Sequence, residues 1–417
     1  MALASRLEAS RWSGEAIERL IARHLPAPFQ RHAGPLARDL MGAFPLRYAP
    51  DAARLMPALL AWPQLDRLVK HCEKTGLWPT PLLAPPRMLP VPPFDHFDLP
   101  VLETIGELAD WLLLTPEQLD ALADRTGWRE AQPLPPIRNY FYRISAKAGG
   151  GVRLIEAPKP RLKAVQRVIQ RGILDRIPPH KDSFGFTKGR SVIGAAQRHA
   201  GEEIVIAFDL QRYFTSITYG RVHALFRHFG YPASVAHALS ALCTLATPAR
   251  IRAQLPYHQR QALKVPHLPQ GAPSSPALAN LLTYTLDRRL SALARALGAQ
   301  YARYADDMVF SGDAMIRAPL LRAVPQIVRD EGFRLNAAKT RVMTRAQRQL
   351  VLGLVVNERV TVPRKEIDRL RATIHGGAWQ RDPAALASLL GQIGWVAQVN
   401  PARGAKLYAQ LEHTAGQ

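Results

Sequence analysis

The chain has 417 residues, 47% of them hydrophobic, which is enough for two or three globular domains and excludes global disorder. It carries 55 Lys and Arg against 33 Asp and Glu, a net charge of +22 that favours a polyanionic partner such as nucleic acid, although a solvated basic surface gives the same number. The two cysteines, Cys72 and Cys243, form no disulfide framework, and no apolar run reaches the ~18 residues of a membrane span, so we expect a reduced, cytoplasmic protein that needs no membrane.

The N-terminal part is predicted to be helical. Residues 1–78 alternate apolar and basic positions at helical spacing, as in EAIERLIARHLP and PALLAWPQLDRLVKHC. Residues 79–100 are dense in proline, which fixes φ and removes a backbone donor, so we expect an extended linker there. We place the first domain boundary at this linker.

Two short helices, a β-hairpin and a basic helix are predicted next. TIGELADWLLLTPEQLDALADRTG contains Thr115 as a candidate N-cap, with Pro116 in the first turn. RNYFYRISAKAGGGVRLIEAP has two runs of aromatic and β-branched residues around three glycines, which is typical of a hairpin. The segment PRLKAVQRVIQRGILDRI is amphipathic and basic, which indicates a helix with one charged face.

Three carboxylates stand in the strand segments that follow. EEIVIAFDL holds a continuous apolar run, typical of a strand buried on both faces, and that run ends at Asp209. YARYADDMVFSGD predicts a second hairpin with Asp306 and Asp307 at its turn. A carboxylate beside a buried strand is costly unless a cation binds it, and three that converge would suit Mg²⁺. Aspartate is also an ordinary turn residue, so the pair alone does not decide between these interpretations.

Further segments stand in a fixed order around these acids. FDLQRYF places Phe214 five residues after Asp209. HLPQGAPSSPALANL is a Gly, Pro and Ser loop that runs into a predicted helix. GFRLNAAKTRVM follows the second hairpin, and QLVLGLVVN comes after it. Upstream stand GGGVRLIEAPKPRLKAVQRVI and SFGFTKGRSV.

In this order and spacing the segments resemble the reverse transcriptase family, over about residues 138–360, and among its members the bacterial retron-type enzymes. The chain departs from many retron enzymes in having LGL where Val-Thr-Gly is common, and Thr215 where proline is common. The resemblance implies an α+β fold, a right-hand polymerase with fingers, palm and thumb and an additional helical N-terminal domain. The expected division is a helical extension ending in a Pro-rich linker over 1–95, a helical lead-in and fingers over 96–200, a palm with the YADD catalytic hairpin over 201–345, and a palm edge with helical thumb over 346–417.

The activity implied by the resemblance is that of an RNA-directed DNA polymerase of retron type in anti-phage defence. Such an enzyme copies a structured non-coding RNA, its template and primer, into DNA from dNTPs by two-metal-ion nucleotidyl transfer, with Mg²⁺ or, in its place, Mn²⁺. The resemblance also implies that an effector or toxin protein can be a partner of the chain. Two alternatives stay open: a defence-associated or abortive-infection reverse transcriptase that makes untemplated DNA, and an inactive RNA-binding scaffold.

The resemblance also assigns roles to individual residues. Asp209, Asp306 and Asp307 are the expected catalytic, metal-binding carboxylates, and Asp306 is the expected stronger second ligand because adjacent strand residues point to opposite faces. Phe214 is expected to exclude a ribose 2′-OH, unless it is simply a core aromatic residue. The other expected nucleotide-binding residues are Arg153, Gln270, Gly271, Lys147 and Lys339, the two lysines having a plain surface role as the alternative. The expected nucleic-acid-binding residues are Lys159, Lys163, Arg167, Lys188 and Arg190.

Overall fold

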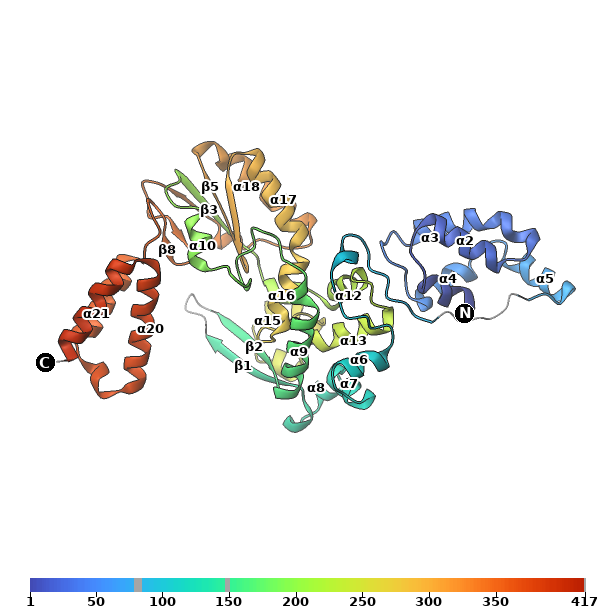
Figure 1. The fold of residues 1–417 in the computed structure, drawn as a ribbon, viewed down its shortest axis with the longest axis horizontal. Helices are drawn as coiled ribbons and strands as arrows, with labels where there is room; N and C mark the ends of the chain where they lie inside the picture. The colour runs from blue at the N-terminus through green and yellow to red at the C-terminus, as the bar shows by residue number, and fades with distance from the viewer. Residues whose placement is uncertain (79–84, 147–150, 416–417) are drawn as a thin grey trace. The chain divides into compact units, whose positions relative to one another are not determined.

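The computed structural model describes residues 1–78, 85–146 and 151–415 of the protein, a mixed α/β chain with a helical N-terminal region (Figure 1). Its residues group into two compact units, each built from two stretches of sequence: Met1–Pro178 with Phe214–Leu282, and Pro179–Tyr213 with Thr283–Gln417. The four consecutive segments expected from the sequence (1–95, 96–200, 201–345 and 346–417) divide the chain differently from these two units, and that division stays a prediction.

The first unit begins with the predicted helices, which have a core of their own. Leu7, Ile17, Ile21 and Leu55 are fully buried in it. Ser13 caps the second helix by accepting a hydrogen bond from the N–H of Ala16. Part of the predicted linker, residues 79–84, lies outside the described residues. The helices are α1 (Ala2–Glu8), α2 (Gly14–His24), α3 (Ala33–Ala43), α4 (Ala52–Leu60) and α5 (Leu65–Thr75).

The rest of the first unit surrounds the predicted hairpin. Thr115 caps α7 in a reciprocal capping box with Gln118, which confirms the predicted helix start. Strand β1 pairs antiparallel with β2, and α9 buries an apolar stripe while exposing its basic face. The elements are α6 (Ile105–Trp111), α7 (Pro116–Ala123), α8 (Trp128–Ala131), β1 (Tyr140–Ala146), β2 (Val152–Pro158), α9 (Pro160–Gly172), α12 (Tyr219–His228), α13 (Ala233–Cys243), α14 (Ala249–Arg252), α15 (Tyr257–Arg260) and α16 (Ser274–Leu282).

The second unit contains a four-stranded antiparallel sheet in the order β4-β5-β3-β6. Strand β3 is buried on both faces, as its apolar run predicts, and lies inside the sheet between β5 and β6. Short α11 (Tyr213–Ser216) carries the chain from this unit to the first. The elements around the sheet are α10 (Val192–Gln197), β3 (Ile204–Asp209), α17 (Tyr284–Ala296), β4 (Gln300–Tyr304), β5 (Asp307–Gly312), α18 (Arg317–Asp330) and β6 (Arg341–Thr344).

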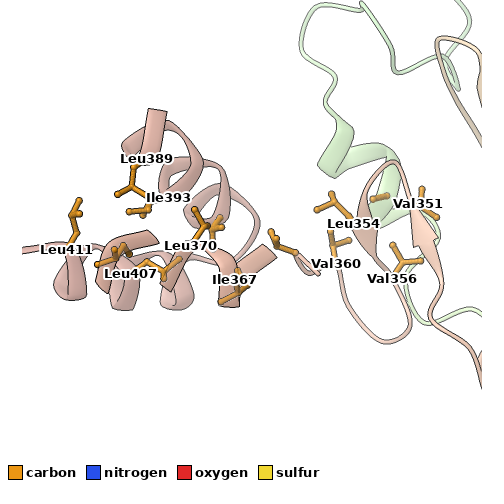
Figure 2. Packing of buried hydrophobic residues seen from close by; sticks show 14 of the residues in the cluster. Val351, Leu354, Val356, Val360, Ile367, Leu370, Leu389, Ile393, Leu407 and Leu411 are labelled. Carbon is orange, nitrogen blue, oxygen red and sulfur yellow. The ribbon is translucent and has the colours of Figure 1, made fainter. Parts of the chain in front are cut away.

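A small hairpin and three helices complete the second unit. Figure 2 shows aliphatic side chains of the three helices packed toward one another, including Leu370, Ile393 and Leu407, all of which are buried. The predicted C-terminal helical module is therefore present. No helix among the described residues is both long and apolar enough to cross a membrane. The elements are β7 (Leu350–Val351), β8 (Leu354–Val355), α19 (Arg364–His375), α20 (Pro383–Val399) and α21 (Pro401–Ala415).

Candidate active site

Backbone pairing brings the three acidic residues to one end of the sheet. Asp209 is the last residue of β3 and stands opposite Asp307, the first residue of β5, in the antiparallel register. The N–H of Leu210 donates a hydrogen bond to the carbonyl oxygen of Asp306 at 2.9 Å. The buried strand and the later hairpin therefore lie side by side, as the sequence predicts, whereas the catalytic role of the acids stays a prediction.

The hairpin turn is tight and closely packed. Tyr304 pairs with Asp307, which leaves Ala305 and Asp306 to make the turn, and Ala305 has a φ of +56°. Gly185 lies directly against it: a Cβ added there would stand 2.5 Å from the nitrogen of Ala305. Gly185, the first glycine of SFGFTKGRSV, is therefore required because the backbone there comes very close to the acidic turn.

A fully buried arginine holds the strand that leads into this turn. The Nε and Nη2 atoms of Arg303 donate to the two carboxylate oxygens of Asp287, each at 2.7 Å. Its Nη1 donates to the carbonyl oxygen of Ala305 and its Nη2 to the hydroxyl of Ser183, both at 2.9 Å. The guanidinium fork thus connects helix α17, the glycine-containing segment and the backbone of the turn.

Sequence reasoning did not identify Arg303 and Asp287 as partners, although one signal was available. In α17 the buried face includes Leu286, Leu290 and Asp287, so a charged residue stands in an apolar stripe. A buried carboxylate needs a cation or several donors nearby. The partner itself, on a strand sixteen positions later, is set by tertiary packing.

Lys339 lies against the acids rather than on an unconnected surface. Its Nζ donates to Oδ2 of Asp209 at 2.6 Å, and that hydrogen bond raises the pKa of Lys339. Asp209 is nearly buried, with 7% of its side chain exposed, while 55% of the lysine side chain is exposed. The N–H of Asn336 also donates to the carbonyl oxygen of Asp209 at 2.8 Å, so the lysine-containing segment is fixed to the end of β3.

The charges at the site favour a bound cation. Desolvation by the surrounding protein, with repulsion from the carboxylates of Asp306 and Asp209, raises the pKa of Asp307 to about 6, although Asp307 is the one exposed residue of β5. Among the described residues, no group of three or more acidic, histidine or cysteine side chains is arranged as a ready-made metal site. The residues fit a metal by their chemistry, because clustered carboxylate oxygens are the ligands that Mg²⁺ prefers and their mutual repulsion is relieved by a cation.

The expected nucleotide-binding residues Arg153, Gln270 and Gly271 all lie in the first unit, as does Phe214. Arg153 is exposed on β2, and the N–H of Glu156 on the same strand donates to the carbonyl oxygen of Gln270 at 2.9 Å. Gly271 has a φ of +138° and lies so close that a Cβ would stand 3.0 Å from the oxygen of Glu156. The structure therefore joins the glycine loop to the hairpin strand.

Glu156 is a second residue that sequence reasoning missed. Its carboxylate is 1% exposed, accepts a hydrogen bond from the hydroxyl of Thr247 at 2.6 Å and lies 3.1 Å from Nε2 of His267. These contacts fix β2 to the strand-like segment that precedes the glycine loop. A lone acid in LIEAPK gave no sequence signal for partners ninety or more positions away.

The expected nucleic-acid-binding residues divide into exposed and engaged groups. Arg167 and Lys188 are exposed, and Lys163 is half-buried on α9. Lys159 donates to the carbonyl oxygen of Pro135 at 2.5 Å and lies 5.4 Å from the ring of Phe141. Arg190 donates to the carbonyl oxygens of His180 and Ser183, at 2.7 and 2.6 Å, so it holds its own segment together. Lys147 lies outside the described residues.

Arg303→Lys is expected to lower the free energy of unfolding by about 3 kcal/mol, because an ammonium group cannot bridge both oxygens of the buried Asp287. Urea unfolding at neutral pH measures this loss. Arg289→Lys is the matched control, since that arginine pairs with Asp330 and Glu331 at the surface, each at 2.8 Å. Equal losses in the two variants would contradict the buried network as the stronger constraint.

Asp307→Asn is expected to stabilise the protein at pH 7 in the presence of EDTA. The raised pKa means that the folded state binds more protons than the unfolded state between about pH 4 and 6, so stability falls as pH rises through that window. Removing the charge should restore roughly 1 kcal/mol at pH 7, after allowance for solvent screening, and nothing at pH 4. An equal urea midpoint for the two proteins at pH 7 would show that the carboxylates do not repel one another.

Comparison with known proteins gives the family. Residues 145–358 match the family model described as reverse transcriptase (RNA-dependent DNA polymerase). A retron Mx65 reverse transcriptase of Myxococcus xanthus is 39% identical over 280 residues, which cover 66% of this chain and 65% of the relative. A retron Mx162 reverse transcriptase of the same organism is 39% identical over 286 residues, 64% of this chain and 59% of the relative. The chain thus spans less than two thirds of these two relatives.

A shorter relative is covered more fully. The retron Ec86 reverse transcriptase of Escherichia coli is 33% identical over 286 residues, which are 67% of this chain and 80% of that protein. Among solved structures, a foamy viral protease-reverse transcriptase in complex with double-stranded DNA has a TM-score of 0.36 and 12% identity over 67% of this chain and 43% of that one, too little to establish a common fold. On the sequence matches, the chain belongs to the reverse transcriptase family, with bacterial retron enzymes among its relatives.

Proposed function

We propose that the chain is an RNA-directed DNA polymerase of retron type, which copies a structured non-coding RNA into DNA from dNTPs. The observation that carries the proposal is the register of β3 and β5, which places Asp209 opposite Asp307 and beside the Asp306 turn. Family membership supports the same reaction class, because the matched region, residues 145–358, contains all three acids.

In this proposal the parts of the chain take the places of a right-hand polymerase. The four-stranded sheet of the second unit is the palm, the β1-β2 hairpin belongs to the fingers, and α19, α20 and α21 form the thumb. The glycine loop at Gln270 and Gly271 lines the nucleotide side of the fingers hairpin, and Arg153 binds the triphosphate through its guanidinium fork.

The residues divide the chemistry among them. Asp209, Asp306 and Asp307 would hold two Mg²⁺ ions, which when bound supply activation of the primer hydroxyl and neutralisation of the triphosphate. Lys339, which donates a hydrogen bond to Asp209, balances the negative charge of the acids, and this proposal gives it the role of neutralising the departing pyrophosphate. Phe214 excludes substrates with a 2′-OH by filling the space beside the sugar.

The partners follow from charge and from the relatives. A net charge of +22 and the exposed basic face of α9 suit the phosphates of an RNA template and its DNA product. The similarity to retron enzymes adds three points to the proposal: a role in anti-phage defence, action in the cytoplasm, and an effector or toxin protein as a partner. An inactive scaffold is disfavoured, because it would not need to keep three carboxylates in mutual repulsion.

A second candidate function is synthesis of untemplated DNA in defence. The observation in its favour is the N-terminal helical region, which has its own core and precedes the matched residues. Sequencing of nucleic acid that co-purifies with the protein separates the two candidates. A defined RNA joined to DNA supports the retron function, and homopolymer DNA joined to protein supports the second.

Asp306→Ala is expected to reduce Mg²⁺-dependent incorporation of dNTPs by at least about 10³-fold, because a metal ligand is lost. Single-turnover primer extension measures the rate, and a filter-binding assay should show unchanged RNA affinity. Asp313→Ala is the matched control, since this exposed acid follows β5 at its other end. Synthesis that survives in the Asp306 variant would refute the metal assignment.

Phe214→Ala is expected to reduce discrimination against ribonucleotides by about 10²-fold, because the removed ring leaves room for a 2′-OH. The ratio of kcat/KM for a dNTP and the matching rNTP measures this effect. Tyr257→Ala removes an exposed ring of the same unit, 74% exposed, and should leave the ratio unchanged. Unchanged selectivity in the Phe214 variant would show that this residue is an ordinary core aromatic.

A further inference from the structure

A cavity of about 250 Å³ lies within the first unit, and none of the residues proposed to act in catalysis, nucleotide binding or nucleic-acid binding lines it. Its walls come from the α1–α2 connection, the segment before α4, the segment after residue 85 and the end of α12. The three acids and Lys339 belong to the second unit, whereas every residue that lines the cavity belongs to the first. Its volume suits one nucleotide and is too small for a duplex.

Arginine dominates the charged lining of this cavity. Arg11, Arg47, Arg87 and Arg227 face two acids, Glu8 and Asp95. Glu8 is already engaged, because its carboxylate accepts a hydrogen bond from the N–H of Ala52 at 2.9 Å. The lining therefore carries two more positive than negative side chains.

The arginines differ in how their charge is balanced. Arg87 pairs with Glu103 at 3.5 Å, outside the lining. Among the ion pairs of the described residues, none involves Arg11, Arg47 or Arg227. Arg11 and Arg47 are exposed and can move toward an anion, whereas Arg227 is fixed.

Arg227 is the unusual member of the set. It is 5% exposed, its Nη1 donates to the carbonyl oxygen of Tyr231 at 3.1 Å, and its Nη2 donates to that of Ala49. Burial lowers the pKa of its guanidinium, although the nearby charges of Glu8 and Asp51 oppose that shift. A buried cation whose hydrogen bonds go to backbone carbonyls, with no ion pair within bonding distance, is costly, and an anion in the adjoining cavity would add to the compensation from Glu8 and Asp51.

Aromatic surface lies beside these charges. The guanidinium of Arg227 stands 5.2 Å from the ring centre of Tyr48, and both Tyr48 and the buried Trp12 line the cavity. The N-cap residue Ser13 of α2 lines it too, so the positive end of that helix is nearby. Cationic forks together with aromatic faces are the combination that recognises a phosphate attached to a base.

We propose that this cavity binds a nucleotide by its phosphate group, with Arg11, Arg47 and Arg227 as the anion-binding side chains. The inference goes beyond the proposed polymerase function and does not depend on it. Two sources share this chemistry, a free mononucleotide and the 5′-phosphate end of an RNA strand, and both are arms of the test.

The test is calorimetric titration of the full chain, freed of nucleic acid and kept in EDTA, with guanosine 5′-monophosphate and with guanosine. The nucleotide is expected to bind at least about tenfold more tightly than the nucleoside, because charge-assisted bonds to phosphate are the main contacts. Arg11→Glu combined with Arg47→Glu, both exposed and outside the helical core, should weaken nucleotide binding by about tenfold or more. Arg38→Glu, at an exposed position of α3 that does not line the cavity, is the control and should change nothing.

The same proteins are then titrated with a short RNA that carries a 5′-phosphate or a 5′-hydroxyl. Tighter binding of the phosphorylated strand identifies a strand end as the ligand, and equal binding identifies the free nucleotide. DNA synthesis by the double variant on a primed template should be unchanged, which separates this result from that of the polymerase. The proposal is overturned if the double variant binds the nucleotide as the parent does, if guanosine binds equally well, or if neither phosphate-bearing probe shows saturable binding.

Discussion

The structure of the candidate site depends on the antiparallel pairing of β3 with β5. That register places the end of one buried strand across from the start of another, so Asp209 and Asp307 meet at the edge of the sheet. The pairing is costly on its own, because it gathers carboxylates that repel one another. Stability is supplied elsewhere, by apolar strands buried on both faces and by hydrogen bonds that fix the turn.

The contacts of Arg303 help to offset the repulsion between these carboxylates. A guanidinium with no solvent exposure binds Asp287 through two oxygens and uses its remaining donors on Ser183 and the turn carbonyl. Every polar group in this set is satisfied by another, so the guanidinium fixes the backbone of the acidic turn to helix α17 and to Ser183. A rigid support beneath a strained, charged turn is what a metal-binding site needs in order to keep its geometry.

Many of the individual strands and helices could be predicted from local sequence. The run Ile204–Phe208 predicted a doubly buried strand, glycines predicted the first hairpin, and Thr115 predicted a helix start, because each depends on neighbours a few residues away. The bond from Lys339 to Asp209 spans 130 positions and could not be derived from spacing alone. The sequence also could not show the contacts of Arg190: its charge predicts phosphate binding, which stays a prediction, and the structure adds that it donates to nearby backbone carbonyls.

The account stands on the claim that Asp209, Asp306 and Asp307 share bound divalent cations. Replacing Mg²⁺ with Fe²⁺ in the presence of ascorbate and peroxide generates hydroxyl radicals at the bound metal and cuts the nearby backbone, and mass spectrometry maps the cuts. The account predicts cleavage near residue 209 and near residues 306–307, suppressed by excess Mg²⁺. Cleavage confined to other parts of the chain, or the same pattern after Asp209→Asn, would contradict it.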